Sequence, residues 1–114
     1  MLQHYQFFSE LLDTVGLAAC LYDEDARAVL WNQNFLAFFP EHAEGIFAGE
    51  PYRENLLRFY RGRLAEKDLP DIDRYVADGI ARHLGQSRPY SFEHHGVWLR
   101  VSCLHMPGVG RLRI

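Results

Sequence analysis

Apolar side chains recur at helical spacing at the start of the chain and then give way to short apolar runs. The spacing predicts an amphipathic helix that ends at Gly16, because glycine readily terminates helices. Two short strands over 17–22 and 28–31 follow, joined by a polar acidic turn. We therefore expect a flanking helix over 1–16 ahead of one domain over 17–114.

The middle of the chain is predicted to be helical. Asn32 suits an N-cap, and Pro40 stops the helix that starts there. Pro51 suits the first turn of another helix, which runs towards Gly62. The clearest helix is capped by Asp71, and its apolar positions form one stripe. These positions are Ile72, Tyr75, Val76, Gly79, Ile80, His83 and Leu84.

The last part of the chain is predicted to form strands over 90–94 and 97–106 and a final strand that includes Ile114. Two early strands and three late strands, separated by helices, predict an α+β domain rather than alternating βαβ units. We expect one five-stranded antiparallel sheet with helices packed across one of its faces.

Composition narrows the range of functions. The chain has 114 residues and a formal net charge of −3, which suits one domain and gives no bulk attraction to nucleic acid. No apolar run reaches the roughly 18 residues that span a bilayer, so we expect no membrane insertion and a cytoplasmic location. Cys20 and Cys103 are expected to be buried, reduced thiols rather than a disulfide.

Three stretches of the chain resemble the PAS family. Ala18–Asp23 followed by Val29–Phe35 is similar to the family's first hairpin and its Trp-Asn step into a helix that carries Phe. Glu93–Val101, with the sequence EHHGVWLRV, resembles the final hairpin. The variant it resembles most is common in bacterial sensor histidine kinases and diguanylate cyclases. The family often has glycine in the first turn where this chain has Ala26, so we expect that turn to avoid a positive φ.

The resemblance implies a small ligand or cofactor between sheet and helices, dimerisation, and an effector domain in the same protein. The ligand-pocket candidates are Trp31, Phe35, Tyr75, Gly79 and His83. Trp31 and Asn32 also suit an aromatic anchor and a helix cap that need no ligand. Some haem-binding members ligate iron through a histidine on the helix that corresponds to the one bearing His83, whereas the alternative is a ring bonded to a backbone carbonyl.

The cofactor stays unknown at this point. The light-sensing members attach flavin to a cysteine within an Asn-Cys-Arg-Phe motif, which this sequence lacks. Non-covalent binding of flavin stays an open alternative.

His94, His95 and His105 suggest the hypothesis of a metal site. With Gly96 at the turn, Val97 pairs near His94, and His105 lies roughly 26 Å further along at ~3.3 Å per residue. Adjacent strand residues also point to opposite faces, so we expect no metal site.

The flanking helix carries a broad apolar stripe, and we expect it to form a homodimer interface through Tyr5, Phe8 and Leu12. No nucleophile elbow, phosphate-binding glycine loop or HExxH motif is present. We therefore expect a sensory, ligand-binding signalling module that is not an enzyme by itself. The alternatives are a haem or flavin sensor, and a small α+β enzyme or carrier whose single pocket uses His83 and Asp residues.

Overall fold

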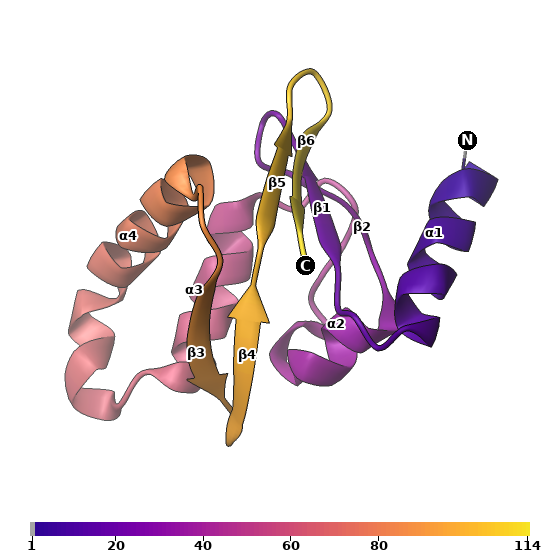
Figure 1. Ribbon diagram of the computed structural model, residues 1–114. Helices are drawn as coiled ribbons and strands as arrows, with labels where there is room; N and C mark the ends of the chain where they lie inside the picture. The colour runs from indigo at the N-terminus through magenta and orange to yellow at the C-terminus, as the bar shows by residue number, and fades with distance from the viewer. Residues whose placement is uncertain (1) are drawn as a thin grey trace.

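The computed structural model describes residues 2–114, and the side chains of Leu2, Gln3 and Tyr5 are not described. It confirms the predicted α+β class (Figure 1). The helices are α1 (Leu2–Thr14), α2 (Gln33–Phe38), α3 (Tyr52–Arg63) and α4 (Ile72–Gly85), with short 3-10 helices η1 (Pro40–His42) and η2 (Glu66–Asp71). The strands are β1 (Cys20–Asp23), β2 (Ala28–Trp31), β3 (Tyr90–His94), β4 (Val97–Val101), β5 (Cys103–Met106) and β6 (Gly110–Arg113).

The strands form two antiparallel sheets, so the prediction of a single five-stranded sheet is wrong. One sheet has the order β2-β1-β6-β5, and the other contains β3 and β4. The segment 97–106, expected as one strand, divides at Ser102. Ser102 exchanges two backbone hydrogen bonds with Ile114, at 2.8 and 2.9 Å, at the end of the β5–β6 pairing. Beyond that point β4 pairs with β3 alone among the described strands, so the two sheets are joined through one residue.

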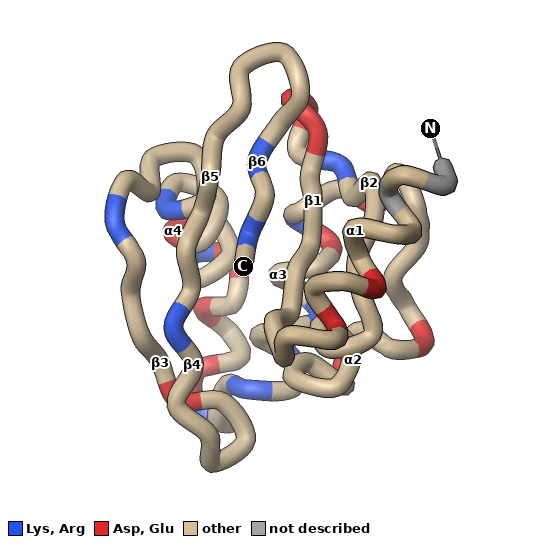
Figure 2. The backbone as a smooth tube through the Cα atoms, turned by 45° about the vertical axis from the view of Figure 1, so that its right-hand side comes forward, with Lys and Arg blue, Asp and Glu red and all other residues tan. Residues whose placement is uncertain are grey.

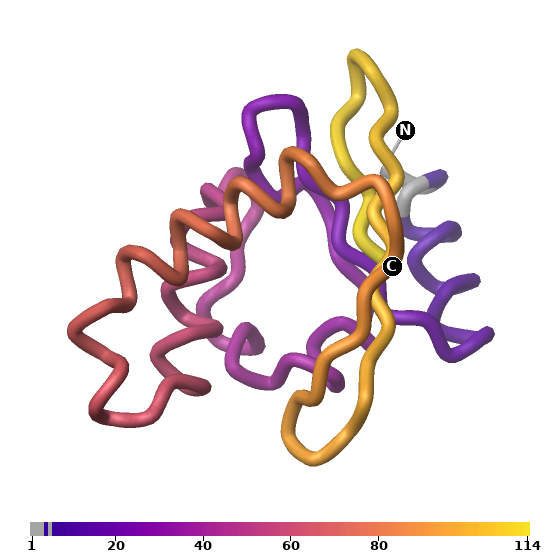
Figure 3. Tube along the Cα trace, turned by 60° about the vertical axis from the view of Figure 1, so that its left-hand side comes forward, coloured from indigo at the N-terminus to yellow at the C-terminus, as the bar shows by residue number. Residues whose placement is uncertain are grey.

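The four-stranded sheet has a helix layer on each side. Its outer face carries Leu21 and Leu112, which pack with Leu12 of α1. Its inner face carries Cys20 and Tyr22, which pack with residues of α2, α3 and α4. Figure 3 shows α3 and α4 on the side of the sheet opposite α1. This separation follows from strand geometry, because successive side chains on β1 point to opposite faces.

Local signals explain most element boundaries. Gly16 has a φ of +79° just after α1, as expected of a glycine helix stop. Asn32 is the predicted N-cap of α2, and its Oδ1 accepts a hydrogen bond from the Phe35 amide at 3.0 Å. Asp71 occupies the N-cap position of α4, but its side chain makes no capping hydrogen bond. Leu84, expected on the buried stripe of α4, is instead exposed in the last turn of the helix.

The first hairpin turn departs from expectation at Ala26. Its φ is +57°, so the prediction that this turn avoids a positive φ is wrong. Asp23 explains how the turn is held, because its Oδ1 accepts hydrogen bonds from the amides of Asp25 and Arg27 at 2.9 and 3.0 Å. These bonds offset the cost of about 1–2 kcal/mol that a side chain incurs in the left-handed region.

Two further features concern the chain as a whole. Cys20 and Cys103 are both free thiols; Cys20 is buried and Cys103 is partly exposed. Within residues 2–114, we find no helix with the length and apolar character needed to cross a bilayer.

Candidate functional site

A cavity of about 380 Å³ lies between the inner face of the sheets and the helices that cover it. Its wall is largely aromatic, and the aromatic rings come from strands and helices that are distant in sequence. They include Tyr22, Phe35, Phe39, Tyr52, Phe59, Tyr60, Tyr90, Phe92 and Trp98. β4 contributes all five of its residues to the same wall. The volume falls within the range of small-molecule sites, about 300–1,000 Å³.

A few polar side chains are placed among these rings. The described residues lining the cavity include Asn55 and three arginines, namely Arg82, Arg100 and Arg113, but no aspartate or glutamate. The Asn55 side chain is buried, and its Nδ2 has no hydrogen-bond partner among the described residues. A buried amide donor without a partner is costly, so Asn55 is an unusual residue in this wall.

Arg113 is the most enclosed of the three arginines. Its guanidinium donates to the Tyr90 hydroxyl at 2.8 Å and to Gln86 Oε1 at 3.3 Å, and it lies 3.2 Å from His83 Nδ1. Its Cζ also lies over the Tyr52 ring, 5.8 Å from the centroid. Tyr90, Gln86 and Tyr52 therefore contact the cation without supplying a negative charge.

His83 lies behind the cavity wall rather than on it. Its ring stacks on Tyr52 with centroids 4.1 Å apart and contacts Tyr22 edge-on at 5.2 Å. Burial, followed by the charges of Arg113 and Arg111, lowers the pKa of His83 to about 3. The ring is therefore neutral at pH 7. With Nδ1 facing an arginine donor, the proton belongs on Nε2, which is buried without a hydrogen-bond partner among the described residues.

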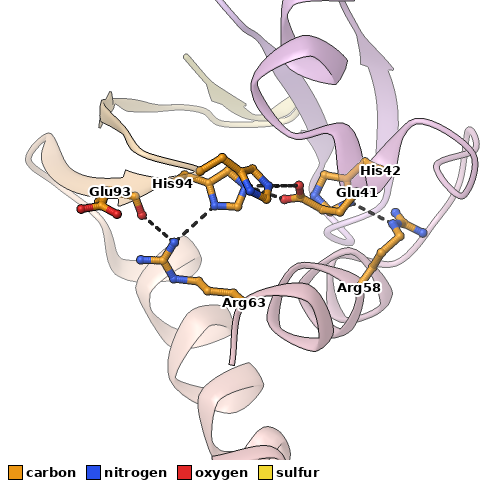
Figure 4. Close-up of polar contacts among 7 residues, drawn as sticks. Glu41, His42, Arg58, Arg63, Glu93 and His94 are labelled. Carbon is orange, nitrogen blue, oxygen red and sulfur yellow. Dashed lines mark hydrogen bonds and ion pairs between the residues drawn. The ribbon is translucent and has the colours of Figure 1, made fainter. Parts of the chain in front are cut away.

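A second polar cluster ties the β3–β4 hairpin to η1 (Figure 4). His94 Nε2 lies 2.8 Å from Glu41 Oε2, and His95 Nε2 lies 3.2 Å from Glu41 Oε1. The ligand atoms of these three residues lie within 4.8 Å of one another. The expectation that the two histidines point apart is wrong, because His95 sits in the turn with a φ of +50°. His105 is separate and pairs with Glu24 at 3.2 Å.

This cluster has the donor set of a metal site, but the hydrogen bonding around His94 does not suit a metal ion. Arg63 Nη1 lies 3.3 Å from His94 Nδ1, and an arginine offers only donors. Nδ1 must therefore accept, which places the proton on Nε2, where it is donated to Glu41. A metal ion at Nε2 needs that lone pair and an N–H at Nδ1. The arrangement is therefore a hydrogen-bonded chain from Arg63 through His94 to Glu41.

The third polar cluster is a buried ion pair under the loop that precedes α3. Glu50 is 2% exposed and accepts two hydrogen bonds from Arg58, at 2.9 and 2.6 Å. Arg58 Nε also donates to His42 Nδ1 at 2.9 Å. Burial, and then the charge of Arg58, lowers the pKa of His42 to about 4, so this ring is neutral at pH 7. Arg58 thus has the carboxylate partner that Arg113 lacks.

Comparisons of the chain with protein-family models, curated proteins and solved structures gave no match. Inference about function therefore starts from the cavity and the side chains on its wall.

The structure places the five predicted pocket residues in different surroundings. Phe35 lies on the cavity wall. Trp31 packs against the buried cluster formed by the inner sheet face and the helices, and the Tyr75 ring lies 5.6 Å from that of Tyr60. Gly79 faces Leu56 so closely that an added Cβ would lie 2.9 Å from its Cδ1, so this glycine brings α4 against α3. Like His83, these three residues lie outside the wall.

The predicted dimer residues are also placed differently from one another. Leu12 is buried inside the chain against β1 and β6, whereas Phe8 is 44% exposed. The side chain of Tyr5 lies outside the described residues. Phe7 and Leu11 of α1, and Val15 just after it, are further exposed apolar residues.

Sequence reasoning missed Arg113 and Asn55 as site residues. Side chains alternate between the two faces of β6, and this alternation could have indicated Arg113. Leu112 is apolar, so its neighbour Arg113 must face the opposite side of the sheet. Asn55 lies on the buried face of α3 one residue before Leu56, and a polar residue at such a position was a second signal.

Proposed function

We propose that this domain is a small-molecule sensor of PAS type, which binds a ligand between its sheets and helices within a larger signalling protein. The observation that carries the proposal is the aromatic-lined cavity of about 380 Å³. Mostly apolar walls with a few placed polar groups are the general character of small-molecule sites. The sequence resemblance to PAS domains supports the same assignment and supplies the expectation of an effector domain in the same protein.

The origin of the cavity wall supports a signalling role. A ligand in the cavity touches α2 through Phe35, α3 through Phe59 and the β3–β4 hairpin through Phe92 and Trp98. Because Tyr22 of β1 also lines the wall, the ligand bridges elements from both sheets and from the helix layer. If the ligand makes these contacts in only one conformation of the domain, binding increases the population of that conformation. Such a shift is how ligand binding can be transmitted as a signal.

A cavity-filling substitution tests the proposal. Ala18 lines the cavity, whereas Ala48 is exposed in a loop away from it, so Ala18→Phe and Ala48→Phe form a matched pair. A diverse small-molecule library is screened by thermal shift, together with mass spectrometry of the undenatured protein. We expect compounds that stabilise the natural chain and the Ala48→Phe variant to lose their effect on Ala18→Phe, while circular dichroism shows that this variant is folded.

Two results would count against the proposal. The first is a pair of negative findings: no compound of the library shifts the melting temperature, and mass spectrometry of the undenatured natural protein gives the mass of the chain without a ligand. The other is a stabilising compound whose effect is unchanged in folded Ala18→Phe, which would place its site outside the cavity.

A further inference from the structure

Arg113 is a partly buried cation whose described contacts supply no negative charge. It lies on β6 with its side chain on the inner face of the sheet, because its neighbour Leu112 packs with α1 on the outer face. The three groups within hydrogen-bond distance are a phenol, an amide oxygen and a neutral imidazole, from Tyr90, Gln86 and His83. Burying a guanidinium is unfavourable unless an anion pairs with it.

A second partly buried arginine shows what is missing. Arg58 meets a buried carboxylate, Glu50, through two hydrogen bonds. Arg113 takes part in none of the ion pairs among the described residues, and no described wall residue of the cavity is acidic. The chain has 15 acidic and 12 basic residues, so the absence of acids from this wall is local and does not follow from composition.

The guanidinium also has hydrogens to spare. An arginine offers five N–H donors, and the three described contacts of Arg113 use two donors of Nη1 and one of Nη2. The Nε hydrogen and one Nη2 hydrogen are left as donors. Two free N–H donors of one guanidinium suit the two oxygens of a carboxylate.

The approach to the cavity is basic as well. An open groove shares Phe59, Tyr60, Arg82, Tyr90 and Phe92 with the cavity. Its described lining adds two more arginines and no acidic residue; these arginines are Arg63 and Arg88. Figure 2 shows basic positions along β6. A cleft lined by one sign of charge attracts ligands of the opposite sign and raises their local concentration.

We propose that the ligand is an organic carboxylate with an aromatic or apolar body, held through its carboxylate by Arg113. This inference rests on the proposed function and names the ligand class for the same cavity. The aromatic rings of the wall accommodate the body of the ligand. A carboxylate fits better than a phosphate, because a phosphate carries more charge than the single enclosed guanidinium can neutralise.

The test uses three probes of one shape: phenylbutyrate, its neutral amide phenylbutyramide and the cation phenylbutylamine. Isothermal titration is performed on the natural chain and on Arg113→Met, Arg113→Lys and Arg111→Met. Arg111 lies on the same strand and face two residues away but outside the cavity wall, so its variant controls for the loss of one positive charge. We expect the carboxylate to bind at least about tenfold more tightly than the amide, as charged hydrogen bonds require.

Arg113→Met should remove this preference while leaving binding of the amide unchanged. Arg111→Met should retain the preference for the carboxylate over the amide. Arg113→Lys should retain part of this preference, because lysine keeps the positive charge but lacks the paired N–H donors of the guanidinium. If Arg113→Met does not fold, the lysine variant and the comparison of carboxylate with amide still test the proposal.

Equal affinity for carboxylate and amide overturns the anion assignment but leaves the cavity as a binding site. Binding of inorganic phosphate in preference to phenylbutyrate also overturns it. Failure of all three probes, and of the library screen, removes the proposed function as well.

Discussion

His42 and His83 are buried imidazoles that remain neutral at a pH where an exposed histidine takes up a proton. Their residues are only 2% and 1% exposed, and burial is the main cause of their lowered pKa values, about 4 for His42 and about 3 for His83. The charges of Arg58 and Arg113, respectively, act in the same direction. Unfolding returns both rings to the ordinary value of about 6.5. Below that pH the unfolded chain binds more protons than the folded one, so acid favours unfolding.

The size of the effect follows from these shifts. At pH 5 each histidine is almost fully protonated in the unfolded chain and almost fully neutral in the folded one. Because one pKa unit corresponds to about 1.4 kcal/mol, each ring lowers the free energy of unfolding by about 2 kcal/mol between pH 8 and pH 5. Together they account for about 4 kcal/mol. The loss begins as the pH falls through about 6.5 and levels off near the folded values, and the lowered pKa of His94 adds in the same direction.

Urea denaturation followed by tryptophan fluorescence at pH 8, 7, 6 and 5 measures this effect. His83→Gln removes one titrating ring and should roughly halve the pH dependence. His105→Gln is the control for the loss of one histidine, because His105 is exposed on β5. A free energy of unfolding that stays level from pH 7 to pH 5 would refute the reasoning, as would an undiminished slope in His83→Gln.

Two further variants test the helix cap and the dimer. Asn32→Ala should lower the free energy of unfolding by about 3 kcal/mol in chemical denaturation, because it removes the cap of α2 and leaves the buried Ala19 amide, now bonded to Asn32 Oδ1 at 2.9 Å, without a partner. A loss below about 1 kcal/mol would contradict this. Light scattering should show a dimer for the natural chain and for Phe47→Asp, whose substituted side chain is exposed in a loop, but a monomer for Phe8→Asp. A monomeric natural chain, or a dimer that persists in Phe8→Asp, would remove the α1 interface.

Short-range signals in the sequence predicted the elements well, because they act through neighbouring backbone groups. Gly16 and Asn32 determine where helices end and begin through conformations that depend on a few residues. The errors arose where contacts distant in sequence decide the outcome. Ser102 divides a strand because the pairing with β6 ends there, and His95 leaves the strand pattern because it lies in a tight turn with a positive φ.

The candidate site was only partly predictable for the same reason. Phe35 lies close in sequence to its helix cap, and its inward position follows from helical spacing. Phe59 and Tyr90 meet at the cavity only because the chain brings α3 and β3 together, and no local pattern encodes that approach. His83 was correctly placed on the buried side of its helix, but its distance from the cavity depends on how Tyr52 stacks against it.

Along the backbone, the β3–β4 hairpin joins the four-stranded sheet only at Ser102, which is held by its two hydrogen bonds to Ile114. At its other end the hairpin is fixed to η1 and α3, because His94 contacts both Glu41 and Arg63. A ligand in the cavity would contact the hairpin through β4, between these two points of attachment. We expect a ligand that shifts β4 to shift Ser102 and the start of β5 with it.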